Sequence, residues 1–228
     1  MASARQGLFI TLEGGEGSGK STQAQDLKEL LEVKGFTVTL TREPAGCPVG
    51  RRVRELLAEP SLELDPRSEL FLLAAARAQH VAEVIRPALE RGEVVICDRF
   101  SDSSVAYQGY GRGLSLDDVR LADRIATEGL VPNLTVLLDV PVEMGLARQE
   151  LALSLSKGGE NVPDRIGQEG AEFHERVRQG YLAMATEEPE RFLVVDATLP
   201  PEEITRTIWR RLELLLSKSR HHPLASEK

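Results

Sequence analysis

The most constraining feature of this sequence is a glycine-rich segment near its beginning. Its residues are Gly14, Gly15, Glu16, Gly17, Ser18, Gly19, Lys20 and Ser21, with Thr22 following. The segment fits the pattern G-x-x-x-x-G-K-[ST], and it lies between an apolar run at residues 8–12 and an amphipathic stretch at residues 21–33. This context predicts a strand, a phosphate-binding loop and a helix that begins near Lys20.

The residue types of this segment indicate what it binds. Glycines let consecutive backbone N–H groups approach one polyphosphate, and the start of the following helix adds positive potential. Lys20 is long enough to reach the β- and γ-phosphates of a nucleotide, and the Ser21 hydroxyl is a ligand for Mg²⁺. We therefore predict that residues 14–22 bind ATP.

A second polar strand end follows later in the chain. The run at residues 94–97 is apolar throughout, and Asp98 and Arg99 come directly after it. Enzymes with a phosphate-binding loop of this type need a carboxylate on a neighbouring strand to organise the metal. We predict that Asp98 serves the metal together with Ser21, and that Arg99 places a cation at the same strand end.

Short apolar runs alternate with longer helical patterns along the whole chain. The runs occupy residues 8–12, 37–41, 94–97, 135–138 and 192–195. Runs that are apolar throughout and separated by helices indicate a parallel sheet covered on both faces. We predict an α/β fold of the P-loop NTPase type, in which one domain over residues 1–228 has a five-stranded parallel sheet flanked by helices.

Several segments carry more local signals. Ser115 with Asp118 three residues later resembles a capping box and predicts the start of a helix. Residues 68–91 are mostly helical in pattern, and Pro87 should end or kink that helix. The Ser/Gly-rich residues 154–163 predict a mobile loop, and the polar residues 217–228 predict a frayed tail.

Composition excludes several classes of function. The net charge of −8 argues against a general nucleic-acid binder, which normally has a basic surface. No apolar run approaches the roughly 20 residues that a membrane-spanning helix needs, and residues 1–7 are too short and polar for a secretory signal. Cys47 and Cys97 form no metal-binding spacing, so we expect reduced thiols in a cytoplasmic protein.

Four further segments carry a family resemblance. They are Thr41-Arg42-Glu43-Pro44-Ala45-Gly46, Ala75-Ala76-Arg77-Ala78-Gln79, Asp98-Arg99 and Ala106-Tyr107-Gln108-Gly109. Together with the glycine loop, their order and spacing resemble the bacterial thymidylate kinases, which are P-loop nucleoside monophosphate kinases. The resemblance covers residues 8–209. It implies that the chain transfers the γ-phosphoryl group of ATP to dTMP with Mg²⁺, and that it forms a homodimer.

The resemblance also implies roles for side chains of the acceptor site. Arg99 and Arg54 match ligands of the 5′-phosphate of the acceptor, and Arg77 matches the arginine that reads the thymine edge. The remaining matches are Ser104 and Gln108 beside the base, Tyr107 near C2′, Glu16 at the sugar 3′-OH, and Glu43-Pro44 at the turn that shapes the pocket.

The sequence departs from the family pattern at two places. Leu73 stands where the family often has a phenylalanine that stacks on thymine, and Phe71 lies two residues earlier. The lid, residues 148–165, is longer than usual and poor in arginine. Its cations are Arg148, Lys157 and Arg165, of which Arg165 matches the family best and Arg148 is the next candidate.

These residues predict a mechanism and leave two alternatives open. Lys20, Mg²⁺ on Ser21 and a lid arginine would cancel charge on the transferred group. Asp98 would orient the water shell of the metal, and Arg99 would hold the acceptor in line. A first alternative is a P-loop kinase for another nucleoside monophosphate or a small metabolite. A second is a nucleotide-dependent switch ATPase, although the N-K-x-D run of guanine-binding switches is absent from the sequence.

Overall fold

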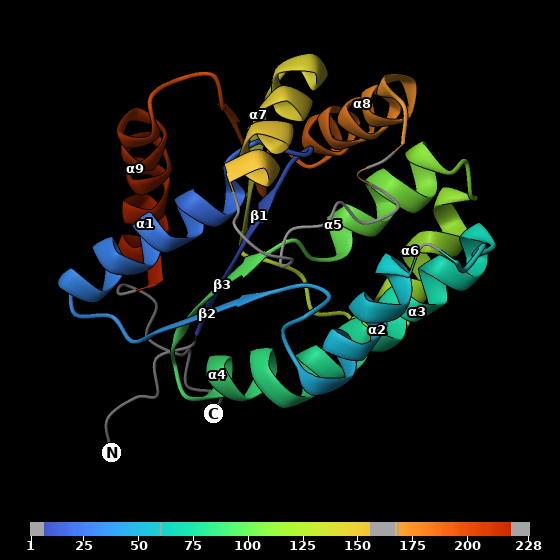
Figure 1. The fold of residues 1–228 in the computed structure, drawn as a ribbon. Helices are drawn as coiled ribbons and strands as arrows, with labels where there is room; N and C mark the ends of the chain where they lie inside the picture. Colours follow the sequence, from blue (N-terminus) through green and yellow to red (C-terminus); the bar gives the residue numbers. More distant parts are fainter. Residues whose placement is uncertain (1–6, 60, 156–166, 168, 220–228) are drawn as a thin grey trace.

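The computed structural model describes residues 7–59, 61–155, 167 and 169–219, and it contains a five-stranded parallel sheet (Figure 1). The strands lie in the order β2-β3-β1-β4-β5. Their bounds are β1 Leu8–Glu13, β2 Val38–Arg42, β3 Val94–Asp98, β4 Leu134–Asp139 and β5 Phe192–Asp196. The predicted α/β fold and its five strands are therefore confirmed.

The sheet explains why the strands read as uninterrupted apolar runs. Ile10 and Leu12 of β1 belong to a core cluster with helices α1 and α9, whereas Phe9 belongs to a cluster on the opposite face. Successive side chains of a strand point to opposite faces, so a strand covered on both faces is apolar at most positions; the buried polar exceptions in β1 are Thr11 and Glu13.

The helices cover both faces. Their bounds are α1 Lys20–Val33, α2 Pro48–Ala58, α3 Pro66–His80, α4 Arg86–Glu90, α5 Ser101–Ser104, α6 Leu116–Thr127, α7 Val142–Leu155, α8 Ala171–Glu187 and α9 Pro201–Ser219, with π-helical turns η1 Val81–Ile85 and η2 Val105–Gly111. Figure 1 shows α1 and α9 together on one side of the sheet, with α2, α3 and α6 gathered on the other. None of the described helices is long and apolar enough to cross a membrane.

The predicted helix signals are largely confirmed. The Ser115 hydroxyl accepts a hydrogen bond from the Asp118 backbone N–H at the start of α6. The predicted helix at residues 68–91 begins at Pro66 and passes through η1 into α4. Pro87 lies in the first turn of α4, directly after the widened π-helical turn, so the N–H that proline lacks falls where the regular hydrogen-bond pattern is already interrupted.

Two predicted boundaries were wrong. The tail was expected to begin at Ser217, but α9 continues to Ser219 and residues 220–228 lie outside the described part. The loop was expected to begin at Ser154, but α7 includes Ser154 and Leu155. The remainder of that loop, residues 156–163, also lies outside the described residues. Cys47 and Cys97 are buried free thiols, as predicted.

Candidate active site

A cavity of about 550 Å³ opens beside the phosphate-binding loop and α1, at the carboxyl ends of β2 and β3. Parallel strands of this fold class place ligands at this end of the sheet. Most of the predicted site residues line the cavity: Glu16, Gly17, Ser18, Gly19, Lys20, Ser21, Thr22, Glu43, Pro44, Arg54, Leu73, Arg77, Asp98, Arg99, Ser104, Tyr107, Gln108 and Arg148. Gly14 and Gly15 lie in the same loop behind the lining, and Arg165 and Lys157 lie outside the described residues.

The glycine loop adopts a backbone that other residues would resist. Gly14, Gly17 and Gly19 all have positive φ angles, of 142°, 62° and 88°. A Cβ atom on Gly17 would also lie 2.0 Å from the carbonyl oxygen of Gly145 in α7. The loop therefore needs glycine at position 17 both for its conformation and for its close approach to α7.

Lys20 folds back over the loop. Its Nζ donates to the carbonyl oxygens of Gly14 and Gly15, at 3.1 and 2.7 Å, and to Ser18 Oγ at 3.1 Å. Burial, helped by the charge of Arg99, lowers the pKa of Lys20 to about 8. A bound phosphate would bring negative charge to a buried cation whose present partners are neutral oxygens.

Ser21 and Asp98 meet as predicted. The Ser21 hydroxyl donates to Asp98 Oδ2 at 2.6 Å, across the gap between α1 and the end of β3. A hydroxyl and a carboxylate are oxygen ligands of the type that Mg²⁺ prefers, and the metal usually keeps several waters. Within the described residues, no group of three or more His, Cys, Asp or Glu side chains forms a protein-only metal site. The pair therefore fits a Mg²⁺ ion that is shared with a nucleotide.

Arg99 occupies a strained position at the centre of the cavity. Its φ of 69° lies in the left-handed region, which is uncommon for a residue other than glycine. Its guanidinium lies 4.9 Å from the centre of the Tyr107 ring and donates to the Gly14 carbonyl at 3.1 Å and to Glu16 at 2.7 Å. The strained turn aims this cation back at the phosphate-binding loop.

Glu16 links the loop to the opposite wall. Its Oε1 accepts from both Arg99 and the Tyr107 hydroxyl. Burial alone would raise the pKa of Glu16, but the charges of Arg99 and Lys20 outweigh it and lower the pKa to about 2. The carboxylate is therefore ionised at neutral pH and is an acceptor for a hydroxyl group.

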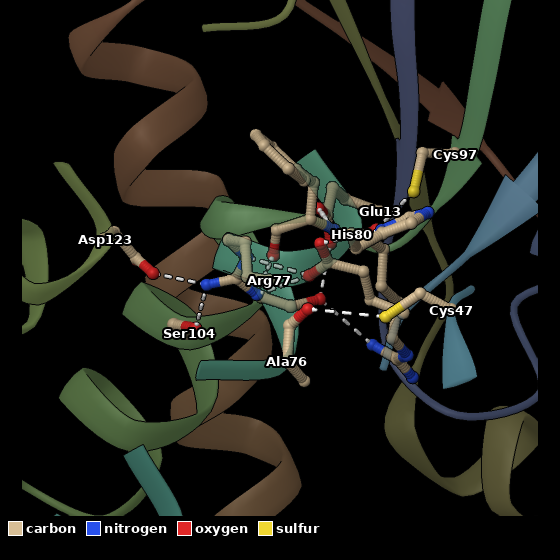
Figure 2. A network of polar contacts seen from close by, with 12 residues as sticks. Glu13, Cys47, Ala76, Arg77, His80, Cys97, Ser104 and Asp123 are labelled. Atoms are coloured by element: carbon tan, nitrogen blue, oxygen red, sulfur yellow. Dashed lines mark hydrogen bonds and ion pairs between the residues drawn. The ribbon is translucent and has the colours of Figure 1, made fainter. Parts of the chain in front are cut away.

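Arg77 lies at the far wall of the cavity, where every one of its nitrogen atoms has an acceptor (Figure 2). Nε and Nη2 contact Glu43 at 2.8 and 2.7 Å, and Nη2 also donates to the Phe100 carbonyl at 3.0 Å. Nη1 donates to Ser104 at 2.7 Å and pairs with Asp123 of α6. Two buried carboxylates therefore hold one guanidinium in a fixed plane.

The comparisons with known proteins agree on one family. Residues 12–208 match the family model described as Thymidylate kinase. A thymidylate kinase of Deinococcus radiodurans is 53% identical over 204 residues, which cover 90% of this chain and 95% of the relative. One of Desulfovibrio desulfuricans is 50% identical over 212 residues, covering 92% and 97%. This chain belongs to the thymidylate kinase family.

A solved structure supports the same assignment. The crystal structure of thymidylate kinase from Ehrlichia chaffeensis superposes with a TM-score of 0.72 at 32% identity, covering 91% of this chain and 98% of that one. The family assignment makes the chain a nucleoside monophosphate kinase and favours this activity over a switch ATPase.

Leu73 and Phe71, which mark the first departure from the family pattern, lie at different places relative to the cavity. Leu73 lines the cavity, whereas Phe71 is 64% exposed on the outside of α3 and lies away from it. Phe71 therefore does not supply the aromatic ring that the family often has at position 73. The cavity wall is aliphatic at this position, which gives packing without aromatic stacking.

The two outer arginines differ in their surroundings. Arg54 is exposed at the rim of the cavity, and the described residues offer it no ion pair. Arg148 of α7 lines the cavity and donates to the Ala197 carbonyl at 2.8 Å. Arg148 is thus held near the loop after β5, and Arg54 is available to an anionic ligand.

Sequence reasoning missed several residues that support the site. Glu13 ends β1 and accepts hydrogen bonds from the Phe100 N–H, Ser103 and Tyr181, at 2.6–2.8 Å. Burial, helped by the charge of Asp102, raises the pKa of Glu13 to about 7. An acidic residue at a strand end, as at Asp98, was the available signal for Glu13. No local signal marked Asp123 or Glu69, since their partners lie far away in the sequence.

Proposed function

We propose that this chain transfers the γ-phosphoryl group of ATP to dTMP, giving dTDP and ADP. One observation supports this most strongly: Lys20 Nζ and Arg99 Nη1 both donate to the Gly14 carbonyl oxygen, each at 3.1 Å. The cation of the donor loop and the cation of the acceptor side thus converge on one atom. Two phosphate groups held by these cations would face each other across a short gap, as transfer requires.

The proposed mechanism depends on alignment and on neutralisation of charge. Lys20 would bind the γ-phosphate and Arg99 the phosphate of dTMP, so the acceptor oxygen lies in line with the bond that breaks. An acceptor phosphate oxygen is already nucleophilic at neutral pH, so no general base is needed. Ser21 and Asp98 would hold Mg²⁺, which supplies additional positive charge to the donor phosphates.

Further residues of the cavity would bind the rest of dTMP. Glu16, ionised and accepting from Tyr107, would accept a hydrogen bond from the sugar 3′-OH. Arg54 at the rim would add a second cation for the 5′-phosphate, and Arg77 with Ser104 would form the wall at the base edge. We also propose that a lid arginine, Arg148 or Arg165, completes the charge neutralisation during transfer.

We further propose that the chain acts as a homodimer in the cytoplasm, where its nucleotide substrates are found. The apolar side chains of Phe71, Leu121 and Ile125 on α3 and α6 are 64%, 45% and 70% exposed. Exposed apolar surface on two neighbouring helices is typical of a protein interface. Light scattering should report a dimer, and Ile125→Glu should shift it toward monomer; a monomeric wild type would contradict the proposal.

An acceptor panel tests the proposed activity. The purified chain with ATP and Mg²⁺ should phosphorylate dTMP with a higher kcat/KM than dUMP, dCMP, dGMP, dAMP or the ribonucleotides. A preference for another monophosphate would support a different kinase of the same fold. Slow release of inorganic phosphate with no phosphorylated acceptor would support a switch ATPase.

A further inference from the structure

One atom at the wall of the cavity lacks a hydrogen-bond partner. Among buried side-chain nitrogen and oxygen atoms of the described residues, Gln108 Oε1, Asp123 Oδ2 and His174 Nε2 have none. Of these three residues only Gln108 lines the cavity. Buried polar atoms in folded proteins nearly always have a partner, so an exception at a ligand-binding wall points to a partner that the ligand supplies.

The other end of the Gln108 amide has a fixed partner. Gln108 is 1% exposed in η2, and its Nε2 donates to Oε1 of Glu69 in α3 at 2.9 Å. Glu69 is 2% exposed and its oxygens accept from Nε and Nη2 of Arg112, at 3.3 and 3.2 Å. A carboxylate that accepts from an arginine has no hydrogen to donate, so the amide must turn its NH₂ group toward Glu69.

Arg112 is itself held firmly in place. Its guanidinium lies 4.9 Å from the centre of the Phe173 ring, and its Nη1 pairs with Glu169. The orientation of the Gln108 amide therefore rests on a chain of contacts from Phe173 through Arg112 and Glu69. Reversal of the amide would place its oxygen against the Glu69 carboxylate and lose a buried hydrogen bond.

The guanidinium donors at this wall are already occupied. All three nitrogens of Arg77 have acceptors, and Ser104 Oγ accepts from Arg77. The Ser104 hydroxyl keeps its hydrogen to donate. Among the described residues that line this wall, Gln108 Oε1 is the buried acceptor without a hydrogen-bond partner, so it can accept from an N–H group of a ligand.

We propose that Glu69 is a specificity-determining positioning residue, which fixes the Gln108 amide so that its Oε1 accepts from an N–H group of the acceptor's base. This inference rests on the proposed function, because it concerns the base that dTMP brings into the cavity. Thymine and uracil have an N–H group at ring position 3. Cytosine has an unprotonated nitrogen there, whose lone pair would face the lone pairs of Gln108 Oε1.

The test is the isosteric variant Glu69→Gln. A glutamine at position 69 both donates and accepts, so the Gln108 amide becomes free to reverse and to present its NH₂ group to cytosine. We expect the KM for dTMP to rise and the inhibition constant of dCMP against dTMP to fall, which together lower the preference for dTMP over dCMP about tenfold or more. The ratio of dTMP to dUMP should stay unchanged, because both bases carry the same N–H group.

The matched control is Glu63→Gln, which removes an exposed carboxylate a few residues before α3 and should change neither ratio. A purely structural role of Glu69 would weaken dTMP, dUMP and dCMP equally, and that result would overturn the proposal. An unchanged preference for dTMP over dCMP would overturn it too. If the wild type phosphorylates no nucleoside monophosphate, the proposed function itself fails, which the panel assay detects separately.

A reciprocal exchange keeps the test decisive even if Glu69→Gln is unstable. In the double variant Glu69→Gln with Gln108→Glu, the glutamine at 69 can donate to the carboxylate at 108, which presents an acceptor oxygen to the base. The preference for dTMP over dCMP should return toward the wild-type value. A folded double variant, verified by its thermal transition, that lacks this preference would contradict the role of Glu69.

Discussion

The two ends of the cavity are built in different ways. The donor end is one continuous segment, residues 14–22, in which three glycines with positive φ and the start of α1 form the cradle. The acceptor end collects side chains from α3, η2, the β2–α2 connection and the turn after β3, among them Glu69 of α3, with Asp123 of α6 behind them. The first end is a backbone structure, and the second is a network of side chains.

This difference predicts how each end responds to substitution. A change at the donor end should act on the rate of transfer, because the loop and Lys20 surround the phosphoryl group that moves. A change at the acceptor end should act mainly on affinity and selectivity for the acceptor, because most of those side chains would contact its base and sugar, and Arg99 would hold its phosphate in both the ground state and the transition state.

The largest effect is expected for Lys20→Ala. Loss of the cation that binds the γ-phosphate should lower kcat about a hundredfold or more. The matched control is Lys28→Ala on α1, where Lys28 pairs with Glu32 and with no other carboxylate of the described residues. Both variants should keep the wild-type thermal transition. Near-normal turnover in a folded Lys20→Ala protein would show that the donor end does not control the rate of transfer.

Arg99→Ala should separate affinity from rate. Arg99 offers charge-assisted hydrogen bonds to the acceptor phosphate, so the KM for dTMP should rise roughly 10- to 100-fold while the KM for ATP stays unchanged. Arg52→Ala, which removes an exposed arginine paired with Glu55, is the control. Steady-state kinetics with each substrate varied in turn give both constants. An unchanged KM for dTMP would show that another group holds the acceptor.

A glycine substitution tests the backbone character of the donor end. Gly17→Ala forces a Cβ atom against the Gly145 carbonyl and into a left-handed conformation, so we expect a loss of roughly 1–3 kcal/mol in the free energy of unfolding. Gly113 has a φ of 77° with no atom near its would-be Cβ, so Gly113→Ala isolates the conformational cost of about 1 kcal/mol. Equal losses in urea denaturation would show that contact with α7 is unimportant.

The smallest effect is a pH dependence. Burial and the charge of Arg99 lower the pKa of Lys20 to about 8 in the free protein, so Lys20 loses its charge as the pH rises through that value. The kcat/KM for ATP should be flat below pH 8 and fall about tenfold for each pH unit above it. Lys20→Arg, which stays charged, should be slower but flat over the same range. A flat wild-type profile would contradict the burial of Lys20.

The difference between the two ends of the cavity also explains which site residues could be predicted from the sequence. The loop at the donor end was predictable from local pattern, because the residues that shape the cradle are neighbours in the chain. The close approach of Gly17 to Gly145 in α7 was not, since Gly145 lies far away in the sequence. The acceptor end was predicted only through the family resemblance, which located Arg77, Ser104 and Gln108. The acceptors that hold Arg77, such as Asp123 and the Phe100 carbonyl, come from distant segments and carry no sequence pattern.

The fold shows a similar limit. The strands were predicted from their apolar runs, since burial on both faces leaves little choice of residue. Helix α2 was missed because its N-cap is Cys47, whose sulfur accepts from the Gly50 N–H in place of the usual hydroxyl or carboxylate. The helical turn η2 was missed because Gly109 and Gly111 lie within it, and glycine is a poor helix former.

The central claim is that one cavity holds two phosphate groups face to face, with Lys20 on one side and Arg99 on the other. Titration calorimetry with a bisubstrate ligand, in which a chain of phosphates joins adenosine to thymidine, tests it most directly. The ligand should bind once per chain, more tightly than ATP or dTMP alone, displace both, and lose affinity in Lys20→Ala and in Arg99→Ala. Binding that displaces only one of the two nucleotides would contradict the claim.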